Sequence, residues 1–442
     1  MNIIEFKERL NVSGMVRTKA GECPVGIEVS YSKHVPGNAE ISVFCKTSEW
    51  KQLAKVLNNR EGGLEVFGHD ERGRTLRLEN ARLKSSRGAR AEFDCTGFTF
   101  GFESTGDAQP HQYWVGVRIP NTALARTSLS EGHSYLGTIQ SERKPDDGIR
   151  WCSPLGDFLI ADFYHFESDH LHDSDVLVRV SATELRHYGK GQPPLDLEPL
   201  ADRVEEVIEE PIYLLSFLSR KQLYWFEIRT NVHIEGSNGS EWREFLRRRE
   251  VAWDIAEHQF LLADPLRLGG DGFDQLLGRL KSSAMKKWLL RAMMYCVASH
   301  CERSLETCLS MAYLAVESLF KAYGVGGKAD KFNRGLRTLM GKAHINSRDL
   351  WPSEVRLGTA CEKLGERRRK FIHEADVEDP AMLDKDCARL QFIVEGTILA
   401  SLGCGREWIH RLAYDTKWLT RGSSGGRITA TAPPQGLYGK GG

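Results

Sequence analysis

The sequence lacks the long apolar run that a membrane-spanning segment requires. Its most apolar stretch, Ile212 to Phe217, is soon followed by Arg220 and Lys221, whereas a helix that crosses a bilayer needs about 20 apolar residues. The N-terminus has no positively charged start followed by an apolar segment, so we expect no signal peptide. These absences predict a cytoplasmic protein without a membrane partner.

The sequence also lacks any Cys-x-x-Cys motif, because its 10 cysteines are scattered along the chain. We therefore expect reduced thiols, with neither a disulfide framework nor a zinc site. The motifs Gly-x-Ser-x-Gly and His-Glu-x-x-His are missing as well, which argues against the hydrolases and metalloproteases that use them. We predict no metal and no cofactor.

The overall charge is balanced, with 60 basic and 60 acidic side chains among 442 residues. Hydrophobic residues make up 41% of the chain, which is ordinary for a globular protein with two or three domains. Residues 1–205 carry 25 basic and 30 acidic groups, a net charge of −5, so the remainder carries +5. This mild asymmetry permits a phosphate-bearing partner for the C-terminal half without requiring one.

Alternating apolar residues predict strands through the first two hundred residues. Three segments alternate clearly: 25–31, 41–45 and 113–119. Short strands between Gly, Asn and Asp clusters are typical of an antiparallel sheet, sandwich or barrel. One helix is expected over 50–57, and a change of phase near Gly97 suggests a bulge. We therefore predict a β-rich sensor or regulatory domain over residues 1–205.

The remainder of the chain is predicted to be mainly helical. A connecting segment over 206–269 should hold a strand at 223–234 and a helix, and a short helix from about Leu200 should end at or before Pro211. Helices are expected near 241–258, 271–299, 302–323, 331–343, 353–375 and 381–402. An all-α bundle over 270–411 and a largely disordered tail over 412–442 complete an α+β multidomain layout.

One residue interrupts the apolar stripe of the helix expected at 353–375. Arg368 falls between Leu364 and Phe371 on that stripe, where a guanidinium is costly unless it is paired or reaches a solvated cleft. His373 lies about 140° from Arg368 on a straight helix, so the pair would converge only where the helix ends or bends, or across a dimer seam. The alternative is a solvated basic helix end with an exposed histidine.

The string Arg368 to Glu374 resembles the Arg-x4–6-His motif of the HEPN superfamily, although Arg369 stands where members commonly have Asn. The segment 313–320 is similar to the helix that packs against that motif in the family. This resemblance covers roughly residues 270–410. It implies an all-α HEPN helical bundle that forms a homodimer or higher homo-oligomer around two copies of the motif, and it implies metal-independent RNA cleavage.

In such a reaction the 2′-hydroxyl of the RNA attacks the adjacent phosphorus. His373 would move protons, because imidazole titrates near neutrality, and Arg368 would stabilise the phosphorane oxygens. Glu317 would orient either side chain. Six cations are candidates for RNA binding: Arg367, Arg369, Lys370, Lys331, Arg334 and Arg337. For each of them, and for Glu317, a solvated helix surface is the alternative interpretation.

The layout resembles ApeA-type anti-phage HEPN proteins, in which a long β-rich region precedes the bundle. This implies a bacterial toxin for abortive infection that cleaves host RNA, with tRNA as one candidate, in response to a phage-derived trigger. Two alternatives remain open. One is a non-catalytic nucleotide- or protein-binding HEPN module with a ligand-binding β-domain. The other is a metal-dependent enzyme that uses the histidines and aspartates between His165 and Asp175.

Overall fold

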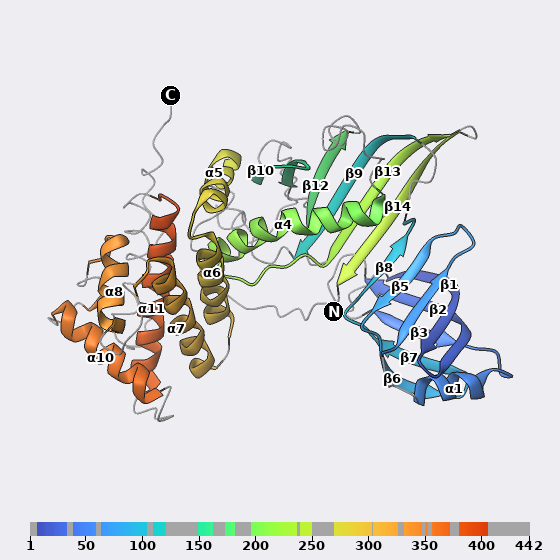
Figure 1. Cartoon of the computed structure of the whole chain (residues 1–442), viewed down its shortest axis with the longest axis horizontal. Coiled ribbons are helices and arrows are strands. Elements are labelled where there is room, and N and C mark those ends of the chain that lie inside the picture. Colours follow the sequence, from blue (N-terminus) through green and yellow to red (C-terminus); the bar gives the residue numbers. More distant parts are fainter. Residues whose placement is uncertain are drawn as a thin grey trace, which may run out of the picture. The chain divides into compact units, whose positions relative to one another are not determined.

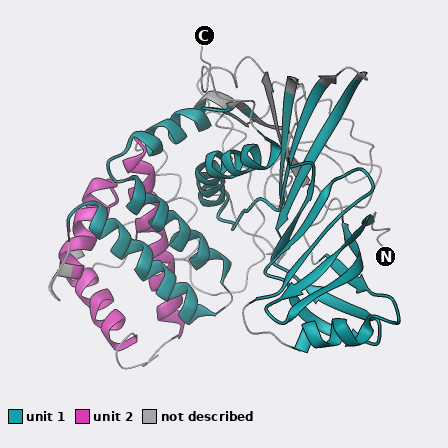
Figure 2. Ribbon diagram, turned by 45° about the vertical axis from the view of Figure 1, so that its right-hand side comes forward, with its two compact units in different colours: residues 1–324 teal, residues 325–442 magenta. Residues whose placement is uncertain are grey.

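The computed structural model describes residues 7–32, 39–58, 63–103, 109–120, 149–161, 173–181, 196–236, 239–249, 269–302, 304–325, 331–346, 350–351, 356–371 and 380–404. The chain divides into two compact units, Met1–Gly324 and Val325–Gly442 (Figure 2). An antiparallel sheet occupies the N-terminal half and helices the C-terminal half, so the predicted α+β layout is confirmed. Within the described ranges, no helix combines the length and apolarity needed to cross a membrane.

The first part of the sheet curls into a barrel-like shape (Figure 1). Its elements are β1 (Lys7–Thr18), β2 (Gly21–Ser32), β3 (Glu40–Phe44), α1 (Trp50–Asn58), β4 (Glu65–His69), β5 (Thr75–Glu79), β6 (Arg82–Arg87), β7 (Arg90–Asp94) and β8 (Gly97–Gly101). The strands follow the order β8-β5-β4-β1-β2-β3-β7-β6. Because β7 and β8 are two halves of one bent segment, this row of strands must curl round on itself.

Alternation along each strand fills the barrel with apolar side chains. Ile27, Val29 and Ile41 are at most 2% exposed, and Leu53 of α1 joins the same core. The strands predicted at 25–31 and 41–45 and the helix predicted at 50–57 are thereby confirmed. The bulge expected near Gly97 is absent, because β8 pairs with β14 and β5 there without a register shift. A Cβ atom at Gly97 would lie 2.5 Å from the carbonyl oxygen of Arg248, so the close approach of β14 depends on a glycine.

Strands β1 and β4 approach each other most closely where Gly14 pairs with Gly68. A Cβ atom on Gly14 would lie 2.1 Å from the carbonyl oxygen of Phe67 and 2.7 Å from the Cα atom of Gly68. Both neighbours are backbone atoms, which cannot rotate away as a side chain can. A side chain at Gly14 therefore requires the two strands to separate.

We predict that Gly14→Ala lowers the local free energy of unfolding of β1 and β4 by about 2 kcal/mol or more, the range of overpacked core sites. Hydrogen–deuterium exchange of these strands measures the change. Gly26→Ala on β2 is the matched control, because its Cβ atom would lie 3.9 Å from the nearest heavy atom. Equal exchange in the two variants would contradict the close approach.

The second part of the sheet continues from β8 with strands that one long helix covers. The elements are β9 (Gln109–Pro120), β10 (Ile149–Ser153), β11 (Gly156–Ala161), β12 (Asp173–Ser181), α4 (Leu197–Ser219), β13 (Glu227–Gly236) and β14 (Gly239–Arg249), in the order β10-β11-β12-β9-β13-β14-β8. Figure 1 shows α4 lying across these strands. Val117, Ile228 and Val232 are fully buried, and the Thr230 hydroxyl donates to the Leu197 carbonyl over 3.1 Å. The strand predicted at 113–119 is confirmed, whereas the strand predicted at 223–234 begins four residues later, at Glu227.

Three predictions about helices are wrong. Residues 241–249 form β14 instead of the start of a helix, because the chain reverses after β13 and pairs with both β13 and β8. Helix α4 continues through Pro211, because burial of the apolar side chains over 212–218 offsets the hydrogen bond that proline cannot donate. The helix expected at 271–299 is two helices that break around Ser283.

The helices of the C-terminal half fall into both units. The larger unit contains α5 (Gly269–Ser282), α6 (Lys286–Cys301) and α7 (Leu305–Ala322), and the smaller contains α8 (Lys331–Lys342), α10 (Leu357–Arg369) and α11 (Pro380–Ser401). Helix α6 packs along α7, and α8 packs against both α10 and α11. Because the division falls after Gly324, a single bundle over 270–411 stays a prediction.

A buried carboxylate joins the barrel to the rest of the larger unit. Glu227 and Arg248 are both fully buried, and their side chains are 3.2 Å apart. Arg229 also donates to Glu227, and Arg118 lies 3.5 Å from it. Burial lowers the pKa of Arg229, but the Glu227 carboxylate outweighs this effect, so the net pKa is raised.

The same network reaches into the barrel through two of its strands. The Arg248 guanidinium lies 4.8 Å from the centre of the Tyr31 ring on β2. The Tyr31 hydroxyl donates to Glu8 on β1, and Glu8 lies 3.5 Å from Arg229. Strands β1, β2, β9, β13 and β14 thus share one set of ionic and cation–π contacts.

We predict that Glu227→Gln lowers the free energy of unfolding of the larger unit by about 3–5 kcal/mol, because it leaves buried guanidiniums without their counter-ion. Chemical denaturation followed by tryptophan fluorescence gives the change. Glu241→Gln is the control: Glu241 is 57% exposed and pairs with Arg243, and exposed pairs contribute at most about 1 kcal/mol. Similar losses in both variants would refute a central role for Glu227.

Candidate functional site

Helix α10 carries Arg368 on the side that faces the core of its unit. Leu364, one turn earlier, is fully buried, as is Cys361, and Arg368 itself is half-buried. Its Cζ atom lies 5.1 Å from the centre of the Phe332 ring on α8, and this cation–π contact offsets part of the cost of placing a guanidinium there. Burial raises the pKa of Cys361 to about 11, so this thiol is protonated and unreactive at neutral pH.

The neighbouring Arg367 forms a two-pronged ion pair with Asp386 on α11. Asp386 is fully buried, and Arg367 donates to its carboxylate through Nε and, over 2.8 Å, through Nη2. Arg389 donates to the same carboxylate over 2.9 Å and to the Leu350 carbonyl over 3.2 Å. A bidentate ion pair of this kind fixes the orientation of the guanidinium relative to the carboxylate as well as the distance between them. They hold the last turn of α10 against α11.

Helix α10 ends at Arg369, one residue after Arg368. Beyond Arg369 the chain forms a π-helical turn at Lys370–Phe371. Such turns bond residue i to residue i+5 and often occur at functional sites. His373, the partner of Arg368 in the predicted catalytic pair, lies outside the described residues, so its role stays a prediction.

The predicted RNA-binding cations lie on α8 and α10, which pack against each other. Three are exposed: Arg334, Arg337 and Arg369. Lys370 is half-buried, and Lys331 begins α8, although its side chain lies outside the described part. The guanidinium of Arg367 is bound by Asp386. RNA binding by these residues stays a prediction.

Glu317, the third predicted catalytic residue, is half-buried on α7. It belongs to the unit Met1–Gly324, whereas Arg368 belongs to Val325–Gly442, and its orienting role stays a prediction. The candidate metal cluster between His165 and Asp175 has all its histidines outside the described residues.

Sequence reasoning missed Asp386 and its partner Arg389. A signal was present, because Leu383, Cys387 and Leu390 form a buried stripe on α11 and Asp386 lies within it. A carboxylate in an apolar stripe needs a cationic partner. The partner Arg367 comes from another helix, so the spacing along α11 alone could not identify it.

The chain matches no protein-family model, no curated protein and no solved structure.

We predict that Asp386→Ala lowers the local free energy of unfolding at the end of α10 by about 3 kcal/mol, because two guanidiniums lose a buried counter-ion. Faster hydrogen–deuterium exchange over α10 and α11 measures this loss. Asp384→Ala on the same helix is the control, because Asp384 is exposed. If the two variants exchange alike, the contacts of Asp386 do not fix α10.

Proposed function

We propose that this chain is a metal-independent RNA endonuclease in which Arg368 and His373 form the catalytic pair. The observation that carries the proposal is the setting of Arg368: a guanidinium on the core-facing stripe of α10, two residues before a π turn at Lys370–Phe371. The neighbouring Arg367 is held by Asp386, so adjacent arginines have different roles. One anchors the helix, and the other is proposed to meet substrate.

The π turn supports the spacing of the pair. On an uninterrupted α-helix, residues five apart lie about 140° from each other. A turn with i→i+5 hydrogen bonds brings such residues toward one side of the helix. The turn occurs at Lys370–Phe371, between the two proposed catalytic residues.

The residue types suit cleavage by the RNA's own 2′-hydroxyl. His373 accepts the hydroxyl proton or donates one to the departing 5′-oxygen, and the phosphorus–oxygen bond to that oxygen breaks as the bond to the 2′-oxygen forms. Arg368 donates to the phosphorane oxygens. The substrate supplies the nucleophile, so the reaction requires no metal to generate one.

Exposed cations beside Arg368 support an RNA substrate. Arg334 and Arg337 on α8 and Arg369 on α10 are exposed on two helices in contact. Such cations bind phosphates without reading sequence. Arg367 binds Asp386 through Nε and Nη2, so a contact with RNA would use its remaining N–H groups.

The proposed biological role rests on the resemblance to anti-phage HEPN proteins. In that role a phage-derived trigger releases the nuclease, host RNA such as tRNA is cut, and growth stops before the phage multiplies. Two copies of the chain would associate around the motif. Induced expression of the wild-type protein in bacteria should therefore arrest growth, and expression of His373→Ala should not. This growth assay is the cellular test of RNA cleavage.

We predict that purified protein cleaves bacterial RNA in excess EDTA and that His373→Ala and Arg368→Ala each lower kcat by about 10²–10⁴-fold, the usual contribution of a positioned acid or base. Arg334→Ala and Arg337→Ala should raise KM with little change in kcat, because they remove phosphate contacts. Lys363→Ala, an exposed change on α10, should have no effect.

Cleavage that His373→Ala and Arg368→Ala leave intact would overturn the assignment of the pair. Wild-type protein that neither cuts RNA nor arrests growth would favour the alternative of a non-catalytic binding module.

A further inference from the structure

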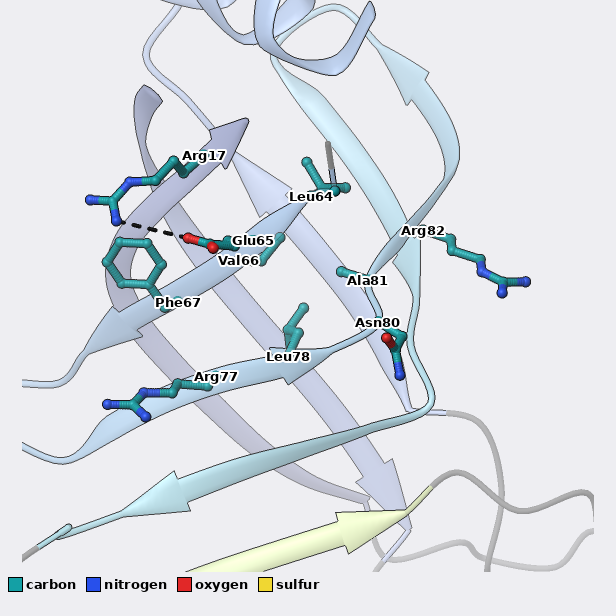
Figure 3. A pocket seen from close by; sticks show the side chains of 11 residues that line it. Arg17, Leu64, Glu65, Val66, Phe67, Arg77, Leu78, Asn80, Ala81 and Arg82 are labelled. Carbon is teal, nitrogen blue, oxygen red and sulfur yellow. Dashed lines mark ion pairs between the residues drawn. The ribbon is translucent and has the colours of Figure 1, made fainter. Parts of the chain in front are cut away.

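The wall of the barrel has an opening bounded by β4, β5 and β6 (Figure 3). Strands β4 and β5 are paired only where 67–69 lies opposite 75–77. Beyond these pairs the chain turns away at Asn80, whose φ is 49°, and continues as β6. On β4, the backbone edge of Glu65 and Val66 that faces β5 has no strand partner among the described residues. A pocket of about 650 Å³ forms there.

The floor of this pocket is aliphatic. Figure 3 shows Leu64, Val66, Leu78 and Ala81 gathered between the strands. Val66, Leu78 and Ala81 belong to the barrel core and are at most 8% exposed. The half-buried Leu64 exposes more apolar surface than these three residues, so the opening reaches only the edge of the apolar core. Its size lies within the roughly 300–1,000 Å³ of small-molecule sites.

Two arginines, Arg17 and Arg77, lie at one side of the opening. Arg17 and Arg77 flank Phe67 in Figure 3, whereas Arg82 points away from the pocket. The Cζ atom of Arg17 lies 4.8 Å from the centre of the Phe67 ring. This contact orients one guanidinium at the boundary between the aliphatic floor and solvent.

Acidic neighbours use only part of these guanidiniums. Arg17 lies 3.1 Å from Glu22 and 3.8 Å from Glu65, and Arg77 lies 2.8 Å from Glu103. The side chains of Arg17 and Arg77 are 50% and 54% exposed. A guanidinium has five N–H donors, so an oxyanion can bind beside these carboxylates.

We infer that this opening binds a small organic anion with an apolar body. The apolar body covers Leu64 and Leu78, the anionic group meets Arg17 and Arg77, and the unpaired strand edge supplies N–H and C=O groups that orient the ligand. Phosphate, sulfonate and carboxylate groups share this chemistry. The site belongs to the larger unit and is independent of the proposed ribonuclease.

The test is a fluorescence titration of the full chain with 8-anilinonaphthalene-1-sulfonate, which joins an aromatic body to one anionic group. The expected result is saturable binding that the double variant Arg17→Gln/Arg77→Gln weakens at least about tenfold, which corresponds to roughly 1.4 kcal/mol. Ala81→Trp, which fills the opening, should abolish it. Leu64→Trp fills the same opening from the residue before β4 and serves if Ala81→Trp does not fold.

Arg72→Gln is the matched control, because Arg72 is exposed in the turn between β4 and β5, outside the pocket lining, and it should leave binding unchanged. The uncharged analogue N-phenyl-1-naphthylamine and inorganic sulfate should each bind far more weakly than the sulfonate. Competition by adenosine monophosphate or by dodecanoate then identifies a phosphate or a carboxylate as the preferred group. Binding that neither the tryptophan variants nor the arginine variant changes, or no saturable binding, would overturn the assignment.

Discussion

The carboxylate of Glu227 is the constraint on which the larger unit depends. It is fully buried among three arginines from β9, β13 and β14, and one of these, Arg248, stacks on a tyrosine of the barrel. Building a buried ion pair contributes little net stability, but removing one partner is strongly destabilising. The main effect of the network is therefore to determine which strands lie next to each other. Its net contribution to the free energy of unfolding is small.

The smaller unit also contains a buried carboxylate that is bound by arginines. Asp386 is a single buried carboxylate bound by two guanidiniums, one from its own helix and one from α10. A carboxylate bound in this way has few alternative positions, because each donor contributes a fixed geometry. Arg368 follows directly after the anchored Arg367. The ion pair between Arg367 and Asp386 therefore fixes the position of Arg368, although Arg368 takes no part in that pair.

The elements that could be predicted from the sequence are those whose pattern is local. The strands around Ile27, Ile41 and Val117 alternate, and the helix from Trp50 has an apolar stripe, so local periodicity sufficed. Strand β14 was misjudged because its partners, β13 and β8, supply the pairing that makes it extended. Pairing across the fold overrides local preference.

The candidate site shows the same limit. Arg368 could be singled out because a cation within an apolar stripe is anomalous on one helix. The ring of Phe332 that receives it and the link from Arg367 to Asp386 come from other helices, and no spacing along the chain encodes them. The π turn after Arg369 is likewise a feature of backbone hydrogen bonding that side-chain periodicity does not reveal.

The bent segment β7–β8 makes the barrel inseparable from the strands that follow it. One edge of β8 pairs with β5 inside the barrel, and the other pairs with β14, where Gly97 lies opposite Arg249. A fragment that stopped after β8 would expose that edge as an unpaired row of backbone groups, which invites aggregation. During synthesis the edge stays open until β14 has emerged, so the N-terminal strands complete their fold late and with a high contact order.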